Sequence, residues 1–428
     1  MSTKLLNRIV NTLCALAFCC PATELHAQWT IDDCQAKAKA NYPLIRQYDL
    51  IEKAKEYSLS NINKYYLPQF HLNAKVSYQS DVTRIPLSLP GINIPELAKD
   101  QYQVYLEAGQ TLWDSGTIRA QKKRTEAASD VEKQRLQVDL YALEERVNQL
   151  FFGVLLLDAQ LEQNQILLDD LERNQATVAG CLEYGIANQA DLDAVKVEQL
   201  NARQIRIQLQ STRQTYLDML SYLMGETLDA QTGCVKPEAN RPLPPEEIHR
   251  PELQWFEAQN RLFESQKDEL KASYLPKLSL FLQGGIGRPG LNMFSRELEP
   301  YAIGGIRLAW NFSGLYTRKN DWRKIAIQQS SVDVQSQTFL FNLNLETTRE
   351  KREIQRLREQ MKYDDEIIDL RRNIRRAAEA KLTNGTATTA DWLREVSREN
   401  LARQQKASHE IEWLIALYRY YNQLGIKN

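Results

Sequence analysis

The chain has 428 residues, of which 25% are charged and 43% are hydrophobic, and its formal net charge is −1. This composition is typical of a folded chain with a large core and excludes a disordered one. Because the charges nearly balance, the chain exerts no long-range attraction on nucleic acid, and we expect no nucleic-acid partner.

Residues 1–27 have the pattern of a secretory signal peptide. Two basic residues precede an apolar run from Ile9 to Cys20, and Ala27 supplies the small residue before a cleavage site. The apolar run is shorter than the ~20 residues that a membrane-spanning helix needs, which argues against an anchor. We therefore expect the mature chain to be exported.

The cysteines leave one alternative open at the amino terminus. Cys19 or Cys20 is a candidate for lipidation, although Phe18 is larger than the residue that usually precedes a lipidated cysteine. The remaining cysteines are odd in number and scattered, so they do not form a disulfide framework. They are Cys34, Cys181 and Cys234.

The mature sequence reads as two copies of one plan. Cys181–Asp191 matches Lys381–Asp391 at an offset of 200 residues, and Tyr66-Leu67-Pro68 recurs as Tyr274-Leu275-Pro276. We predict a first repeat over 28–225, a proline-rich linker over 226–250 and a second repeat over 251–428. Each repeat is expected to contain a helix, a β-hairpin, a long helix and a return helix.

The first helix of each repeat is expected over about Ile31–Tyr65 and Pro251–Tyr274, with a proline closing each one. Apolar and polar residues then alternate, which predicts strands with one apolar face. The alternative is a soluble antiparallel sheet packed on a core. The candidate lipid-facing residues are Phe70, Leu72, Val76, Tyr102, Val104, Leu106, Leu280, Ile306 and Leu308.

Aromatic residues near the ends of these strands fit an interfacial girdle of the kind that flanks the apolar band of membrane barrels. Their positions at strand ends are read from the alternation alone. They are Phe70, Tyr78, Tyr102, Trp113, Tyr301 and Trp310.

Two long helices follow the hairpins, over about Gly116–Glu183 and Gly314–Thr383. Between Leu136 and Leu171 apolar residues recur with a period near 3.5, the coiled-coil spacing, and the second helix keeps a rougher seam. A helix of roughly 65 residues reaches about 100 Å, so its seam needs partners of similar length. Return helices are expected to end at Gly225 and Gly425.

Strand count and lipid chemistry together constrain the assembly. Four strands in one chain cannot close a barrel, because small barrels need about eight. An apolar sheet with open edges is not tolerated in lipid. Several chains must therefore pool their hairpins, and because each strand region runs directly into a long helix, the sequence predicts an oligomeric duct with one end in a lipid membrane.

The chain resembles the TolC-like outer-membrane efflux proteins over essentially its whole mature length. The resemblance rests on the two-fold repeat, the two Tyr-Leu-Pro sequences, and the strand-to-helix passages at Trp113–Gly116 and Trp310–Gly314. The turn segments Gly185–Asp191 and Gly385–Asp391 complete it. The expected fold class is α+β, mostly α: long antiparallel coiled-coil helices forming a periplasmic tunnel, plus two β-hairpins contributing to a transmembrane β-barrel.

The resemblance implies a homotrimer in the outer membrane with a 12-stranded barrel, a periplasmic membrane-fusion adaptor and an inner-membrane pump as partners. It makes the helix reversals the mouth where an adaptor docks, with Tyr184, Gly185, Asn384 and Gly385 as candidates. The alternative for both glycines is plain capping of a helix end.

The resemblance also points to a tunnel constriction. Asp391 matches the family's acid there, and Asp191 is its counterpart in the first repeat. The family's second acid is replaced by Arg394, which we expect to pair with Asp391 three residues away. The alternative is an ordinary solvated helix acid.

No sequence feature indicates catalysis, a cofactor or a metal site, and we expect a protein that is not an enzyme. Gly285–Gly290 matches a dinucleotide fingerprint only formally, because no helix is expected after it. The basic run Arg371–Arg376 is expected to pair with acids one or two turns earlier, among them Asp364, Asp365 and Asp369. Two rival functions remain: the outer duct of a type I protein secretion system, and an exported coiled-coil scaffold.

Overall fold

A computed structural model describes residues 28–83, 97–185, 187–238, 244, 247–293 and 295–426. The predicted signal peptide, with Cys19 and Cys20, lies outside these residues, as does part of the predicted linker. The chain divides into two compact units, each of which takes segments from both predicted repeats. We call Met1–Tyr42, Tyr141–Ile248 and Leu345–Asn428 the helical unit, and Pro43–Leu140 and His249–Asn344 the sheet unit.

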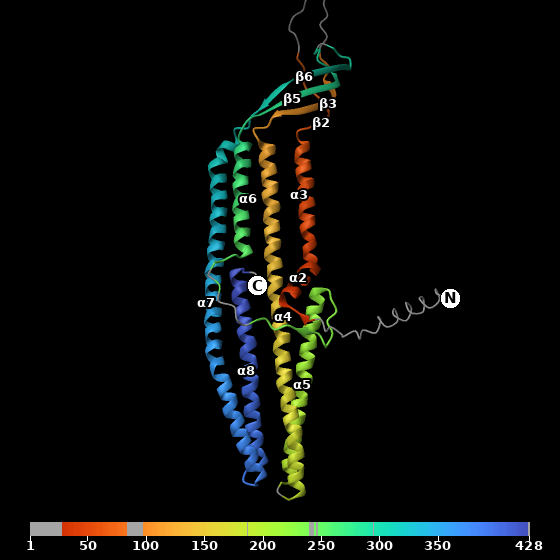
Figure 1. The fold of residues 1–428 in the computed structure, drawn as a ribbon. Helices are drawn as coiled ribbons and strands as arrows, with labels where there is room; N and C mark the ends of the chain where they lie inside the picture. The colour runs from red at the N-terminus through yellow and green to blue at the C-terminus, as the bar shows by residue number, and fades with distance from the viewer. Residues whose placement is uncertain are drawn as a thin grey trace, which may run out of the picture. The chain divides into compact units, whose positions relative to one another are not determined.

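The helical unit is built from two helix hairpins and a short amino-terminal helix. Its elements are β1 (Gln28–Trp29), α2 (Ile31–Asn41), α4 (Thr117–Glu183), α5 (Gln189–Met224), β4 (Gly233–Cys234), α7 (Gly314–Thr383) and α8 (Thr389–Leu424). Figure 1 shows α4 beside α5 and α7 beside α8. Helices α4 and α7 each begin in the sheet unit and end in this one.

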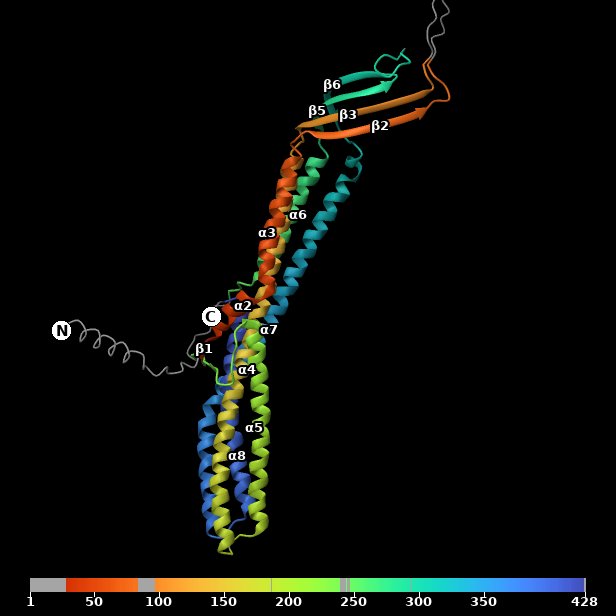
Figure 2. The same cartoon turned by 90° about the vertical axis from the view of Figure 1, so that its right-hand side faces the viewer.

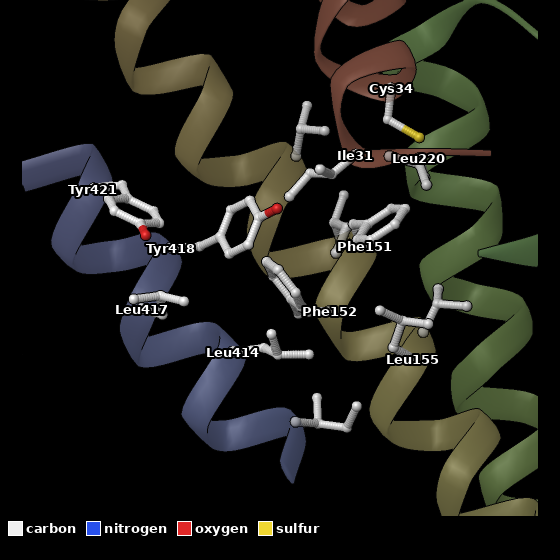
Figure 3. Close-up of a cluster of buried hydrophobic side chains, with 14 of the residues drawn as sticks. Ile31, Cys34, Phe151, Phe152, Leu155, Leu220, Leu414, Leu417, Tyr418 and Tyr421 are labelled. Carbon is white, nitrogen blue, oxygen red and sulfur yellow. The ribbon is translucent and has the colours of Figure 1, made fainter. Parts of the chain in front are cut away.

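The core of the helical unit lies where α2, α4, α5 and α8 meet (Figure 3). The ring of Phe152 on α4 packs edge-on against Tyr418 of α8, with ring centroids 4.9 Å apart. Phe151 is fully buried beside it. The predicted seam of α4 is confirmed in this unit, since Leu143, Val147 and Val154 are buried in the same cluster.

Glycine ends both return helices as predicted. Gly225 and Gly425 have φ angles of 69° and 76°, a left-handed conformation that costs other residues energy. The N–H groups of Gly425 and Ile426 donate to the carbonyls of Asn422 and Tyr421, the paired bonds of a Schellman cap. The caps therefore satisfy carbonyls that the helix ends would otherwise leave unpaired.

The sheet unit combines one antiparallel sheet with helices. Its elements are η1 (Pro43–Arg46), α3 (Gln47–Lys64), β2 (Gln69–Tyr78), β3 (Asp100–Trp113), α6 (Pro251–Ser273), β5 (Lys277–Arg288) and β6 (Glu299–Ala309). In the described residues β2, β3, β5 and β6 pair in that order to form a four-stranded sheet (Figure 2). Ion pairs between Arg124 and Glu269 (2.9 Å) and between Arg261 and Asp130 (2.6 Å) join α4 to α6.

The mostly helical α+β fold class is confirmed, and one predicted helix is corrected. The helix expected over Ile31–Tyr65 is interrupted, because Tyr42 is extended before Pro43 and a 3₁₀ turn follows. A residue before proline is pushed out of the helical region, and proline itself lacks the N–H that the helix needs. The parallel pair β1–β4 was not predicted, since each strand has only two residues.

The formal dinucleotide fingerprint at Gly285–Gly290 falls on the end of β5 and the connection to β6, so it does not open a helix. Across the described residues, none of the helices has an apolar stretch long enough to cross a membrane.

Replacing Phe152 by alanine is expected to lower the free energy of unfolding by about 3–5 kcal/mol, because it removes a fully buried ring from the core of the helical unit. The measurement is chemical denaturation of the purified chain. Tyr184→Ala, at a side chain that is 83% exposed, is the control and should stay within about 0.5 kcal/mol of the wild type. Equal losses in the two variants would contradict this placement of the core.

Candidate functional site: a two-faced sheet and two hairpin tips

One face of the sheet is apolar from edge to edge. Leu72 lies opposite Leu106, and Val104 lies opposite both Ala74 and Ile286, so these side chains share a face across β2, β3 and β5. Leu280 and Ile306 continue the same face onto β6. The predicted period of two is therefore preserved across all four strands.

The side chains of this apolar face are exposed in the single chain. Leu72, Val76 and Ile306 are 73%, 76% and 66% exposed. Monomeric soluble proteins rarely leave an apolar patch this continuous uncovered. The predicted lipid-facing residues Phe70, Tyr102, Val104, Leu106, Leu280 and Leu308 are exposed as well.

The opposite face is polar and joined by hydrogen bonds across the strands. Glu107 on β3 accepts from Gln283 on β5 (2.6 Å) and from Arg307 on β6 (2.8 Å). The Arg307 guanidinium also lies 4.6 Å from the centroid of the Phe281 ring. These charge-assisted bonds tie three strands together on the face that does not carry the apolar residues.

Tyr301 corrects one part of the girdle prediction. Its hydroxyl accepts a hydrogen bond from the Gln103 side chain (2.6 Å), which places it on the polar face. Along β6 Tyr301 alternates with Ile306 and Leu308, so the period of two itself assigns it to the polar face together with Arg307. Trp310 does lie at a strand end, where its indole N–H donates to the carbonyl of Tyr274 (3.0 Å).

Strands β2 and β6 form the edges of the described sheet. Each pairs on one side only, β2 with β3 and β6 with β5. An edge strand presents a row of N–H and C=O groups for pairing with another chain. With 10 and 11 residues, these edges are long enough to template a full strand on either side.

Each helix hairpin of the helical unit reverses at a glycine. Gly185 and Gly385 have φ angles of 71° and 69°, which only glycine adopts without strain. The N–H groups of Gly385 and Thr386 donate to the carbonyls of Leu382 and Lys381, and Gly185 repeats the first of these bonds. The side-chain amide of Asn384 donates to the carbonyl of Ala380 (2.8 Å), and the Tyr184 side chain is exposed.

Both candidate constriction acids take part in capping boxes. The Asp191 carboxylate accepts from the N–H of Asn188 (3.0 Å), and the Asp391 carboxylate accepts from the N–H of Thr388 (3.3 Å). Arg394 lies 3.3 Å from Asp391, so the expected i,i+3 pair forms. Their position in a tunnel constriction stays a prediction.

The hydroxyl and backbone N–H of Thr388 hold the pKa of Asp391 below its ordinary value, with the Arg394 charge acting in the same direction. The carboxyl group is therefore charged throughout the neutral range. In the cap this charge lies at the positive end of the α8 dipole, where an anion is stabilised.

The two tips share a small core. Trp392 of α8 is fully buried together with Val396, Val178 of α4 and Val195 of α5. This cluster packs the α4–α5 tip against the α7–α8 tip within the helical unit. Trp392 is not among the residues expected from sequence, although it directly follows the candidate acid Asp391 and a large apolar ring at that position favours burial.

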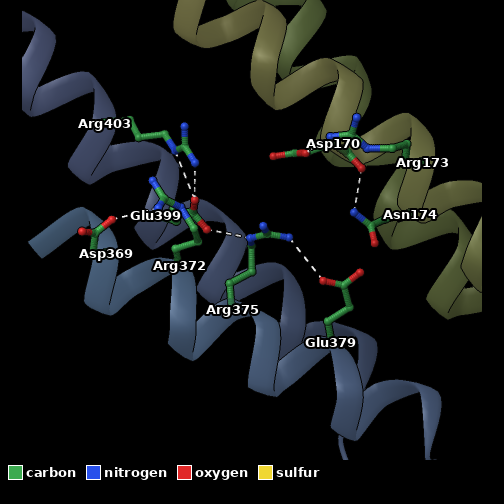
Figure 4. A network of polar contacts seen from close by, with 9 residues as sticks. All are labelled: Asp170, Arg173, Asn174, Asp369, Arg372, Arg375, Glu379, Glu399 and Arg403. Carbon is green, nitrogen blue, oxygen red and sulfur yellow. Dashed lines mark hydrogen bonds and ion pairs between the residues drawn. The ribbon is translucent and has the colours of Figure 1, made fainter. Parts of the chain in front are cut away.

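The basic run on α7 pairs differently from the prediction (Figure 4). Arg372 does bond Asp369, one turn earlier, at 2.8 Å. Arg375, however, crosses to Glu399 of α8 at 2.6 Å, where Arg403 also donates. Asp364 and Asp365, predicted partners of this run, instead face α8, because the interhelix register is not visible in the spacing along one helix.

The charge of Glu399 is held by its two arginine partners. Burial alone would raise the pKa of this carboxyl, but the hydrogen bonds from Arg403 and Arg375 outweigh it and leave the pKa lowered. A buried carboxylate with two cationic partners is a fixed charge in the α7–α8 interface. Removing one arginine would leave buried charge uncompensated.

The fold matches solved outer-membrane channels. The channel OprN superposes with a TM-score of 0.71 at 14% identity, over 93% of this chain and 90% of that one. VceC from Vibrio cholerae gives 0.64 at 12% identity, over 92% and 96% of the two chains. The MtrE channel of Neisseria gonorrhoeae, solved in an open state, gives 0.65 at 15% identity, over 92% and 89%. No family model and no curated protein sequence matches the chain.

Asp391→Asn is expected to weaken the α8 cap at neutral pH, seen as faster amide exchange over the first turn of α8. Because the pKa of Asp391 is lowered in the folded chain, its contribution is present above the ordinary carboxyl pKa of about 4 and is lost as pH falls further. The difference between wild type and variant should therefore shrink at pH 3. Asp193→Asn, outside the cap, is the control, and a pH-independent difference at Asp391 would contradict the account.

Proposed function

We propose that this chain is a subunit of an outer-membrane channel that works as the passive duct of an export system. The observation that carries the proposal is the sheet, whose one face is apolar and uncovered while its opposite face is polar and hydrogen-bonded. That alternation is what a strand needs when one side meets lipid and the other meets water. The shared fold of OprN, VceC and MtrE supports the same reading.

Completion of the sheet requires further copies of the chain. In lipid every backbone polar group must find a partner, so the free edges of β2 and β6 have to pair with other strands. A neighbouring copy offers β6 to β2 and β2 to β6, which closes a ring by a repeated contact. We propose three copies, giving the 12 strands that the family resemblance implies.

Helix α7 offers a second surface for self-assembly. Within the helical unit Tyr363, Ile367, Leu370 and Ile374 recur at intervals of four, three and four residues and are exposed. This is coiled-coil spacing that no other described segment of the chain covers. A helix from a neighbouring copy would bury the stripe and extend the bundle into a tunnel wall.

The hairpin tips are the proposed contact with the other components of the export system. Gly185 and Gly385 give the tips their turn, and Tyr184 supplies an exposed aromatic ring beside the first of them. We propose that a periplasmic membrane-fusion adaptor docks there and connects the duct to an inner-membrane pump. Asp191, Asp391 and Arg394 are proposed to line the constriction, with the capping boxes holding the two carboxylates and Asp391 pairing with Arg394.

Two other functions remain as candidates. A type I protein secretion system would use a duct of the same architecture, and the polar face of the sheet does not distinguish the cargo. An exported scaffold would instead keep the sheet in water. The exposure of Leu72 and Val76 counts against it, because a soluble sheet would cover them.

Leu72→Arg is expected to prevent assembly in the membrane, because an arginine on the lipid side of a barrel costs about 2–4 kcal/mol near the bilayer midplane. Asn73→Arg, on the adjacent residue and the opposite face, is the matched control and should be tolerated. The measurement is the amount of heat-modifiable trimer in the outer-membrane fraction. Equal tolerance of both substitutions, or loss of both, would count against a lipid-facing apolar surface.

Reconstitution tests the duct itself. The purified assembly, added to a planar lipid bilayer, is expected to give discrete conductance steps, and the Asn73→Arg variant should retain them. A purified chain that stays monomeric in aqueous buffer and gives no conductance would overturn the proposal in favour of a scaffold.

A further inference from the structure

The two helix hairpins of the helical unit can be compared position by position. Helices α4 and α7 end at Glu183 and Thr383, and α5 and α8 run over Gln189–Met224 and Thr389–Leu424. The offset of 200 residues seen at the tips therefore holds along both hairpins. Buried positions match at this offset, with Val154 and Ile354, Leu157 and Leu357, and Ala202 and Ala402 all buried.

Several buried polar positions differ at this offset, for example Gln199 and Glu399, and one of them places a histidine beside a carboxylate. In the first hairpin Asn164 is 1% exposed, and its amide donates to the carbonyl of Ala202 on α5 (3.1 Å). In the second hairpin the equivalent residue is Asp364, 6% exposed, whose carboxylate oxygens lie 2.9 and 3.2 Å from Nδ1 of His409 on α8. The residue equivalent to His409 is Leu209, which is half-buried. Two titratable groups thus stand where the first hairpin has an amide and an aliphatic side chain.

The charged groups around His409 have partners of their own. On α7 the neighbouring Asp365 bonds Lys406 of α8 (2.5 Å), so these two charges compensate each other. On α8 the next residue, Glu410, bonds Lys236 of the connection between the repeats (2.7 Å). Asp364 is therefore the acid that faces His409 directly.

Three charged side chains of α4 and α5 in the same unit also have partners. Asp158 of α4 bonds Arg213 of α5, and Arg206 bonds Gln165. Histidine is the side chain whose charge ordinarily changes between pH 5 and 8. Among the groups named here, His409 is the one of that type.

Protonation changes the bond that His409 makes. A neutral imidazole can donate one N–H to the Asp364 carboxylate. An imidazolium makes the same bond with full charge on both partners, and charge-assisted bonds are roughly twice as strong as neutral ones. Because Asp364 is buried, its charge is poorly solvated, and a cation beside it is worth more than it would be at the surface.

We infer that His409 and Asp364 form a proton-responsive latch that holds α7 against α8 more tightly when the surroundings acidify, and that the α4–α5 hairpin has no such latch. The inference concerns packing inside the helical unit and holds whether or not the chain conducts. If the proposed duct function also holds, one of the two hairpins that reach the tips responds to periplasmic pH while the other does not.

Hydrogen exchange of the full mature chain at pH 6 and pH 8 tests the latch, with labelling times scaled for the intrinsic rate at each pH. Peptides spanning Asp364 on α7 and His409 on α8 should be more protected at pH 6 by a few-fold. Peptides spanning Asn164 and Leu209 are the internal control and should show no such change. This comparison needs no variant.

The double variant Asp364→Asn/His409→Leu gives the second hairpin the residue pair of the first. It should fold, since that pair already occupies the equivalent positions, and its pH response should disappear. The reciprocal variant Asn164→Asp/Leu209→His should give the first hairpin a response. Equal pH responses in both wild-type hairpins, or a response that survives in the first double variant, would overturn the inference.

Discussion

The pairing of backbone polar groups at the two open edges of the sheet is the constraint on which the rest of the structure depends. The apolar face formed by residues such as Leu72, Leu106 and Ile306 favours lipid, where an unpaired N–H or C=O costs several kcal/mol. In lipid, the edge strands of a sheet with such a face therefore have to pair with further strands. The polar face, tied by Glu107 to Gln283 and Arg307, is suited to water.

The long helices also carry apolar surface, which must be covered by other helices in water. A seam of coiled-coil period on α4 is buried against α5 and α8 in the helical unit, where Phe152 and Tyr418 meet. The stripe on α7 from Tyr363 to Ile374 has the same period and remains exposed. One seam is thus satisfied within the chain and the other is available to a neighbour. The sheet edges and the exposed stripe each support the proposed self-assembly, for independent physical reasons.

Much of this architecture is accessible from the sequence because its signals are periodic. Alternation locates the strands, the heptad seam locates α4, and Gly185, Gly225, Gly385 and Gly425 mark helix ends by their conformational freedom. The helix break at Pro43 does not stand out in this periodicity, because apolar residues continue on both sides of it.

The spacing of residues along one helix or strand does not specify its register against another. Arg375 is expected from sequence to bond acids one or two turns earlier on α7, yet it bonds Glu379 one turn later and reaches Glu399 across the α7–α8 interface. Asp364 is expected to pair with the same basic run and instead meets His409. In each case a contact between distant residues decides the outcome, and no local pattern encodes it.

Disulfide cross-linking between the two sheet edges tests the proposed assembly most directly. Within one chain β3 and β5 separate β2 from β6, so at about 4.8 Å per strand the edges lie about 14 Å apart, beyond the ~7 Å that a disulfide spans. Pairs of cysteines, one on β2 and one on β6 of a chain without native cysteines, are scanned in register and oxidised in the membrane. We predict covalent dimers and trimers, and nothing larger, at matching registers. A chain that forms no cross-linked species at any register would contradict the claim that copies of this chain complete one another's sheet.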